Sequence, residues 1–330
     1  MSLPEQFTTI TQETIIPQIF DQSSVEPSLF NYVMSSAEKK PGGTNIKVPV
    51  KTSNDTQGGS YAPNAVFTTN MPNTRTSFEF DWTFHQQPIV VANPYVAMSG
   101  GSKEQILSVL GEATEEAWTD FREMVSNQLV GAGLGTDLLG LQALIDDGTR
   151  VASYGGKTRS TDTYAQANYT GSVGTLAQAD MQQAYRDCER LGEAPDMIWT
   201  HTEVRDAYED IVLPTLQNNV NVNKITAQKP TESKGMQMFM DYGSSLLSYK
   251  GVPIFTDNHI ASDAMYFWNK KYMKFYVLPN KVYTGTKEYG VTFRPMDAPI
   301  NQDAQVGYFM IYGQWVNHKP DATACLDGIS

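Results

Sequence analysis

The chain has 330 residues, of which 40% are hydrophobic and 18% charged, and its 24 Lys and Arg against 36 Asp and Glu give a net charge of −12. This composition predicts a folded chain of about two domains, and the shortage of positive charge argues against wrapping nucleic acid or binding an anionic membrane. No apolar run is long enough to span a bilayer and the first basic residue is Lys39, so neither a membrane anchor nor a signal peptide is predicted, and we expect a cytoplasmic protein.

Residues 1–40 are predicted to form an N-terminal arm. The segment is acidic and contains spaced apolar residues, and it is interrupted by Pro4, Pro17 and Pro27. These prolines exclude one continuous helix. We expect short helical pieces whose apolar side is covered either by the same subunit or by another one.

Residues 41–87 are predicted to form an extended hairpin. Apolar and polar residues alternate over 44–51 and again over 76–84, which indicates two half-buried strands, and the polar stretch between them indicates a long tip. A two-stranded hairpin is marginal alone, so its apolar face must be covered by its own domain or by a neighbouring subunit. We expect a subunit interface, formed by Ile46, Val48, Val50, Phe78, Phe80, Trp82 and Phe84.

A long amphipathic helix is predicted within residues 88–135. It starts at a capping box of Ser102 and Gln105, carries one apolar stripe and an acidic side for about eight turns, and ends at Gly131. Gly111 interrupts this pattern, where glycine costs about 1 kcal/mol relative to alanine.

Shorter elements are predicted after residue 135. Two helices are expected to be capped by Thr175 and Thr200, the second running to about Asp210, with a buried strand at 197–199 between them and a polar loop over 217–234. Further strands are expected at 245–249, 252–256, 264–269, 274–278, 291–295 and 305–316.

The residues predict no catalytic, cofactor or metal site, and we expect no enzyme activity. The glycines at 131, 133 and 135 follow a helix instead of opening one, which argues against a dinucleotide loop. The four histidines lie in four different predicted elements, and the pair His201 and Glu203 lacks metal-ligand spacing. Cys188 and Cys325 are expected to be inert thiols.

The order of these parts resembles the major capsid proteins of tailed bacteriophages, whose fold is shared with bacterial encapsulins. The resemblance covers the whole chain, and each of its motifs is loose by itself. Those motifs are 43–49 (GTNIKVP), 133–135 with 140–141 (GLG, GL), 197–200 (MIWT), 249–254 (YKGVPI) and the 308–314 strand.

The resemblance implies an α+β capsid fold. Its parts would be an N-terminal arm (1–40), an extended hairpin or E-loop (41–87), a peripheral domain with the spine helix (88–135), an axial α/β domain (136–275), and return strands of the peripheral domain with the C-terminal end (276–330). In this family the spine helix is bent in the precursor shell and straighter in the mature one. This makes Gly111 the predicted hinge, against the alternative that it only makes room for a packed neighbour.

The implied function is a structural one. Pentamers and hexamers of the chain would build an icosahedral shell around phage DNA, without sequence-specific binding, in a virion assembled in the host bacterial cytoplasm. A separate scaffold protein, a portal and a decoration protein are the expected partners besides the chain itself. An encapsulin-type compartment and a soluble hydrolase with unseen carboxylates are the alternatives.

Overall fold

The computed structural model describes residues 28–55, 57–66, 71–94, 103–190, 193–217, 247–278, 285–286, 291–298 and 302–330, with backbone alone at 103–110, 213–217 and 285–286. Most of the predicted N-terminal arm, the cap residue Ser102 and nearly all of the polar loop at 217–234 lie outside these residues.

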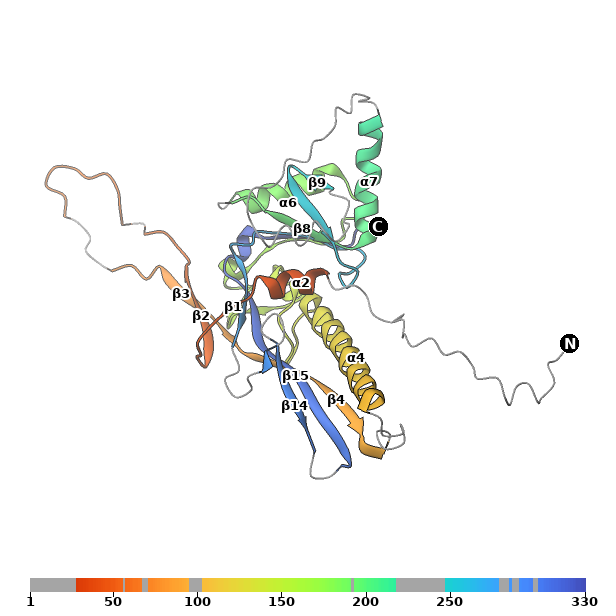
Figure 1. Cartoon of the computed structure of the whole chain (residues 1–330). Helices are drawn as coiled ribbons and strands as arrows, with labels where there is room; N and C mark the ends of the chain where they lie inside the picture. The colour runs from red at the N-terminus through yellow and green to blue at the C-terminus, as the bar shows by residue number, and fades with distance from the viewer. Residues whose placement is uncertain are drawn as a thin grey trace, which may run out of the picture.

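The longest strand, β15 (Ala304–Asn317), organises the first sheet (Figure 1). One edge of β15 pairs antiparallel with β4, from Ala304 opposite Ala92 to Gly313 opposite Thr83. Its other edge pairs with β12 and β14 in succession. The remaining strands of the sheet are β1 (Glu38–Lys39), β4 (Thr83–Ala92), β12 (Met273–Val277), β13 (Gly285–Thr286) and β14 (Thr292–Asp297).

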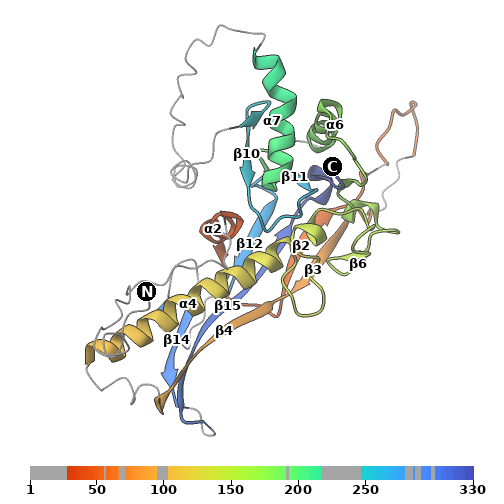
Figure 2. The ribbon, with the colours of Figure 1, turned by 90° about the vertical axis from the view of Figure 1, so that its right-hand side faces the viewer.

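Helix α4 (Lys103–Val130) lies along one face of this sheet (Figure 2). The buried side chain of Phe309 on β15 contacts two aromatic residues of the helix, with ring centroids 5.3 Å from Trp118 and 6.3 Å from Phe121. Aromatic rings supply large apolar contact areas, so this cluster ties the helix to the sheet. The 28 residues of α4 confirm the predicted long helix and its end before Gly131.

The second sheet has apolar cover on both faces. Helices α6 (Gln178–Glu189) and α7 (Thr202–Gln217) pack with Ile198 and Phe267, while Trp199 and Trp268 belong to the core on the opposite side. Burial on both faces explains why the central strands of this sheet, Met197–Thr200 and Met265–Trp268, are apolar almost throughout instead of alternating. The strand order is β7 (Asn168–Thr170), β16 (Ala324–Leu326), β11 (Met265–Trp268), β8 (Met197–Thr200), β10 (Val252–Thr256) and β9 (Ser248–Tyr249).

Three tryptophans join the two sheets. Trp199 and Trp268 of the second sheet stack with centroids 6.0 Å apart, and Trp268 meets Trp315 of the first sheet edge-on at 6.1 Å. All three side chains are almost fully buried. One continuous apolar core therefore runs from α4 through the first sheet to the second.

Each predicted strand has a counterpart in the structure, whereas two helix starts differ from expectation. Thr175 does not cap α6, which begins at Gln178 with the Asp180 carboxylate accepting the Ala177 amide at 3.1 Å. At α7 the cap is His201, whose Nδ1 accepts the Glu203 amide, while the Thr200 hydroxyl donates to the Ala264 carbonyl. This helix is also longer than predicted.

Strand β4, an edge strand that contains Pro88, was not predicted. Proline is tolerated there because β4 pairs through one edge, with β15. The short elements complete the fold: α2 (Ser28–Ser35), β2 (Asn45–Lys51), β3 (Arg75–Asp81), α5 (Leu141–Leu144), β5 (Ser153–Tyr154), β6 (Lys157–Thr158), η1 (Thr163–Ala165) and η3 (Pro320–Ala322).

A buried ion pair holds the segment that follows α5. The guanidinium of Arg159 lies 3.3 Å from the Asp146 carboxylate and donates to the carbonyls of Ala143, Val151 and Ala165, and both charged side chains are fully buried. Asp146 also accepts backbone amides that follow it in the chain. Both buried charges therefore have hydrogen-bond and ion-pair partners. Such partners are needed because an unpaired charge is costly to bury.

We expect Arg159→Leu to lower the free energy of unfolding by about 3–5 kcal/mol, because it removes one of the two cations of the buried Asp146 carboxylate, leaving only Arg150 at 3.4 Å, and takes the donor from three carbonyls. Urea denaturation of the purified chain measures this. Arg205→Leu is the control, since its ion pairs with Asp206 and Glu209 lie at the surface and are worth about 0–1 kcal/mol. Equal losses in the two variants would contradict a special role for Arg159.

Candidate functional site

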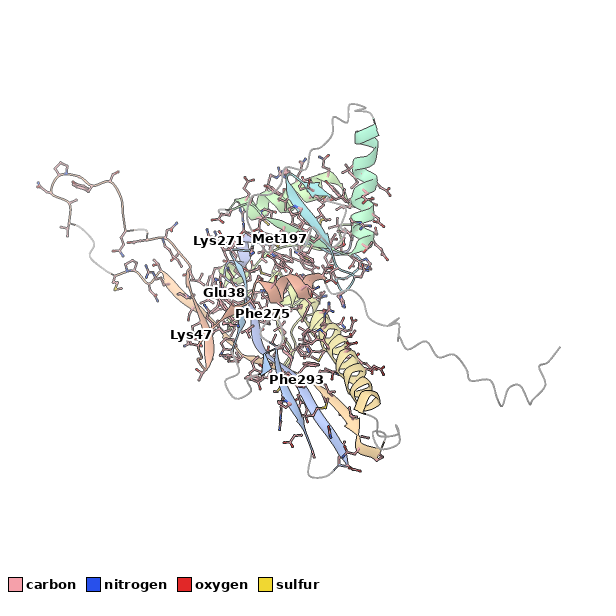
Figure 3. All side chains as sticks on the ribbon, in the orientation of Figure 1. Glu38, Lys47, Met197, Lys271, Phe275 and Phe293 are labelled. Atoms are coloured by element: carbon pink, nitrogen blue, oxygen red, sulfur yellow. The ribbon has the colours of Figure 1, made fainter. Side chains whose placement is uncertain are left out.

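The predicted hairpin is formed by β2 and β3 and projects from the body of the molecule (Figure 1). The strands pair from Asn45 opposite Asp81 to Lys51 opposite Arg75, which confirms the predicted hairpin of two half-buried strands. On the exposed face Lys47 (Figure 3) forms an ion pair with Glu79 directly across the hairpin at 2.8 Å. The hydrogen bond from Lys47 lowers the pKa of the Glu79 carboxyl.

Beyond the strands the hairpin continues into a long exposed tip. Thr52 donates its amide to the Thr74 carbonyl at 2.9 Å, which closes the base of the tip. A turn follows at 62–65, where proline occupies the second position and Asn64 the third with φ of 76°, as a type II turn requires. Apolar side chains are nevertheless exposed on the tip: Tyr61 at 70%, Val66 at 96% and Met71 at 98%.

The root of the hairpin is part of the chain's own core. Phe78 is fully buried, with its ring 5.3 Å from Tyr154 and 5.9 Å from Tyr164, and Phe80 lies 5.1 Å from Tyr154. The chain passes so close at Gly155 that a Cβ there would lie 2.6 Å from the Phe78 Cβ, and its φ of 55° also favours glycine. The Gly155 carbonyl accepts the Glu79 amide at 3.0 Å, which fixes the hairpin to the 153–158 turn.

This burial corrects the expected subunit interface for four of its seven residues. Ile46, Val48, Phe78 and Phe80 are buried by the same chain, and Val50 and Trp82 pack against that core while partly exposed. The polar segment 153–165 supplies the cover, which periodicity within the hairpin could not reveal.

Phe84 lies apart from the other six, because β3 ends at Asp81 and β4 begins at Thr83 in a different sheet. Trp82 lies between the two strands and shifts the alternation by one residue, so that Thr83 and His85 are buried while Phe84 is 64% exposed. Its side chain therefore points to the opposite face from the one predicted.

Phe84 marks a partly exposed apolar face of the first sheet, on the side away from α4. Its ring meets Tyr312 of β15 edge-on at 5.2 Å, and Val90 is 55% exposed. Tyr308 and Met310 lie opposite Pro88 and Gln86 and are also partly exposed. We call this surface the outer sheet face, formed by Phe84, Gln86, Pro88, Val90, Tyr308, Met310 and Tyr312.

We expect Phe78→Ala to lower the free energy of unfolding by about 3–5 kcal/mol, because a fully buried ring leaves a cavity. Phe84→Ala is the matched control on the neighbouring strand, and its exposed side chain predicts a change within about 0.5 kcal/mol. Chemical denaturation of the single chain compares them. If Phe78→Ala were the neutral variant, the hairpin root would not belong to the monomer core.

Gly111, the predicted hinge, lies inside the continuous helix α4 and is exposed. A Cβ built there meets no heavy atom within 4 Å in the described part of the chain. The described contacts therefore give no support to the alternative that this glycine makes room for a packed neighbour. The hinge itself stays a prediction.

We expect Gly111→Ala to raise the stability of the monomer by about 0.5–1 kcal/mol, since alanine has the higher helix propensity and fits the open space. The melting temperature and helical circular dichroism measure this. A loss of about 1–3 kcal/mol would instead indicate overpacking.

Among the described residues, no group of three or more His, Cys, Asp and Glu side chains could hold a metal ion, and no helix is long and apolar enough to cross a membrane. Both cysteines are buried, and burial raises the pKa of each thiol, that of Cys325 to about 12. The absence of enzyme activity remains a prediction.

One polar cluster, around His259, was not predicted. The ring of His259 lies between the carboxylates of Asp257, at 2.6 Å, and Glu123, at 3.0 Å. On the acidic side predicted for this helix, Glu112, Glu115, Glu116 and Asp120 are exposed, whereas Glu123 is only partly exposed and faces His259. Because 136 residues separate Glu123 from His259, no local pattern connects them.

No family model and no curated protein matches the sequence. Solved structures do. The capsid asymmetric unit of cyanophage A-1(L) has a TM-score of 0.75 at 14% identity, over 99% of each chain. The capsid of the Myoviridae phage XM1 has a TM-score of 0.60 at 11% identity, over 100% of this chain and 99% of that one. The SrpI encapsulin of Synechococcus elongatus PCC 7942 has a TM-score of 0.59 at 12% identity, over 100% of this chain and 97% of that one. The chain therefore has the α+β fold of phage major capsid proteins and encapsulins, along its whole length.

Proposed function

We propose that this chain is the major capsid protein of a tailed bacteriophage and that copies of it assemble into a closed shell. The observation that supports this most directly is the match to the cyanophage capsid over 99% of both chains. In this proposal, pentamers and hexamers tile an icosahedral shell that encloses DNA, in virions assembled in the cytoplasm of a bacterial host.

Two exposed apolar surfaces would provide the contacts between copies. One is the hairpin tip with Tyr61, Val66 and Met71, and the other is the outer sheet face around Phe84 and Val90. Exposed apolar patches of this kind mark interaction sites, and an interface of standard size buries about 1,600 Å² in total. The tip projects away from its own body (Figure 1), so a second copy is the partner that it can reach. We assign the outer sheet face to the hairpin of a neighbouring copy.

The two sheets fit the parts that the capsid fold assigns. The first sheet with α4 would be the peripheral domain with its spine helix, and the second sheet with α6 and α7 the axial domain at the centre of each capsomer. Gly111 would let α4 bend in the precursor shell and straighten in the mature one. A scaffold protein, a portal and a decoration protein are the further partners of this proposal.

The encapsulin match supports one alternative, a compartment that encloses protein. The two functions differ in cargo. Particles purified from the producing cell and treated with nuclease would retain long DNA if they are capsids, and would hold protein without DNA if they are compartments.

We expect the double variant Phe84→Ser with Val90→Ser to remain a folded chain that no longer forms shells, because both side chains are exposed on the outer sheet face. Sedimentation and electron microscopy score assembly, and the melting temperature scores folding. Gln86→Ser is the matched control, since it changes an exposed polar residue between the two on the same strand face. The control should form shells like the wild type.

Normal shells from the double variant would exclude this face as a contact. A wild-type chain that stays monomeric at every concentration, with or without its scaffold, would overturn the proposed function itself.

A further inference from the structure

His259 joins three elements that are distant in the sequence. It follows β10, and its Nε2 lies 3.0 Å from the Glu123 carboxylate of α4. Its Nδ1 lies 2.6 Å from Asp257, whose second oxygen accepts the Leu29 amide in the first turn of α2 at 2.6 Å. Helix α2 lies at the junction of the two sheets (Figure 1), so the cluster ties α4 to this junction.

The geometry favours a doubly protonated ring. An ionised carboxylate only accepts hydrogen bonds, and a neutral imidazole carries a single N–H. Both contacts can therefore be hydrogen bonds only if the ring carries two protons, as imidazolium. The side chain is 3% exposed, so water cannot replace either partner easily.

The two carboxylates differ in how firmly they are held beside the His259 ring. Asp257 is fully buried and is held by the amides of Leu29 and His259 as well as by the ring. Glu123 is 31% exposed and can turn to water. When the ring loses one proton, the remaining N–H stays with the buried Asp257, and the bare Nε2 lone pair then faces the Glu123 carboxylate and repels it.

We propose that His259 is a pH-sensitive latch, which binds α4 through Glu123 while protonated and releases it when the Nε2 proton is lost. This inference rests on contacts within one chain and does not depend on the proposed function. Its consequence is that the helix carrying Gly111 is held more firmly at low pH than at high pH.

The direction in which pH changes the stability follows from the charged groups that face the His259 ring. Glu123 approaches from α4 and Asp257 from the loop after β10, while residues 28–35 of α2 include no acidic or basic side chain. Burial opposes the charged ring, but the two carboxylates outweigh it and raise the pKa of His259 above its usual 6.5. The stabilisation is therefore complete below the unfolded-state pKa and is lost as pH rises through the higher folded-state pKa.

Nuclear magnetic resonance of the imidazole nitrogens tests the latch in the full chain, with His259→Gln used to assign the signal among the four histidines. We expect His259 to titrate above pH 6.5 and to become the Nδ1–H tautomer. Glu123→Gln keeps an acceptor but removes the charge, so it should lower the midpoint. His201→Gln is the control, because His201 caps α7 and should leave the His259 titration unchanged.

Amide hydrogen exchange in α4 provides the second measurement. After correction for the intrinsic pH dependence, protection near Glu123 should fall through the His259 midpoint, and this fall should disappear in His259→Gln. Any of three results would overturn the latch. They are a wild-type His259 titration midpoint at or below pH 6.5, a neutral ring protonated at Nε2, and amide protection in α4 that does not change through the His259 midpoint. The wild-type titration decides the question even if a variant fails to fold.

Discussion

The contact between the two sheets through Trp199, Trp268 and Trp315 is the constraint on which the rest of the structure depends. Each sheet buries one face against helices, and the second face of the second sheet is covered because these rings pack against the first. Large aromatic side chains are suited to this, since each one fills the space between two layers without a polar group that needs many partners. The joint in turn brings the start of α2 and the 257–259 loop beside α4, which is what assembles the polar cluster around His259.

The same core extends into the root of the hairpin. The root therefore anchors the hairpin to its own chain, while the tip is left for contacts with another copy. Phe78 and Phe80 hold the strands to the 153–165 segment, which Arg159 and Asp146 hold in turn from inside. A hairpin that is anchored in this way has a defined direction before it meets any partner, and a preorganised surface loses less conformational freedom on association. Most of the exposed large apolar side chains among the described residues lie on the tip and on the outer sheet face, where another copy can cover them.

Charge is used differently inside the molecule and on its surface. The exposed carboxylates of α4 contribute to the net charge of −12 and keep the helix soluble, whereas Glu123, one turn further along, faces a buried cation. A charge withdrawn from water must be paired, and the pairing here joins elements that otherwise meet through apolar contacts. The helix thus has an attachment in its C-terminal third, at Glu123, and an exposed glycine about three turns before it, at Gly111, an arrangement that suits an element expected to bend.

The sequence by itself determined the local elements. Alternation predicted β2, β10 and β15 almost to the residue, and the apolar stripe with its terminal glycine predicted the extent of α4, because these patterns record which side of an element is buried. Only the tertiary structure decided what covers each side. The shift at Trp82 turned Phe84 to the other face, His201 took the cap expected of Thr200, and Glu123 met a histidine far along the chain. Periodicity within a segment says how much of it is buried, but not which distant residues cover it, since those contacts exist only once the sheets have packed.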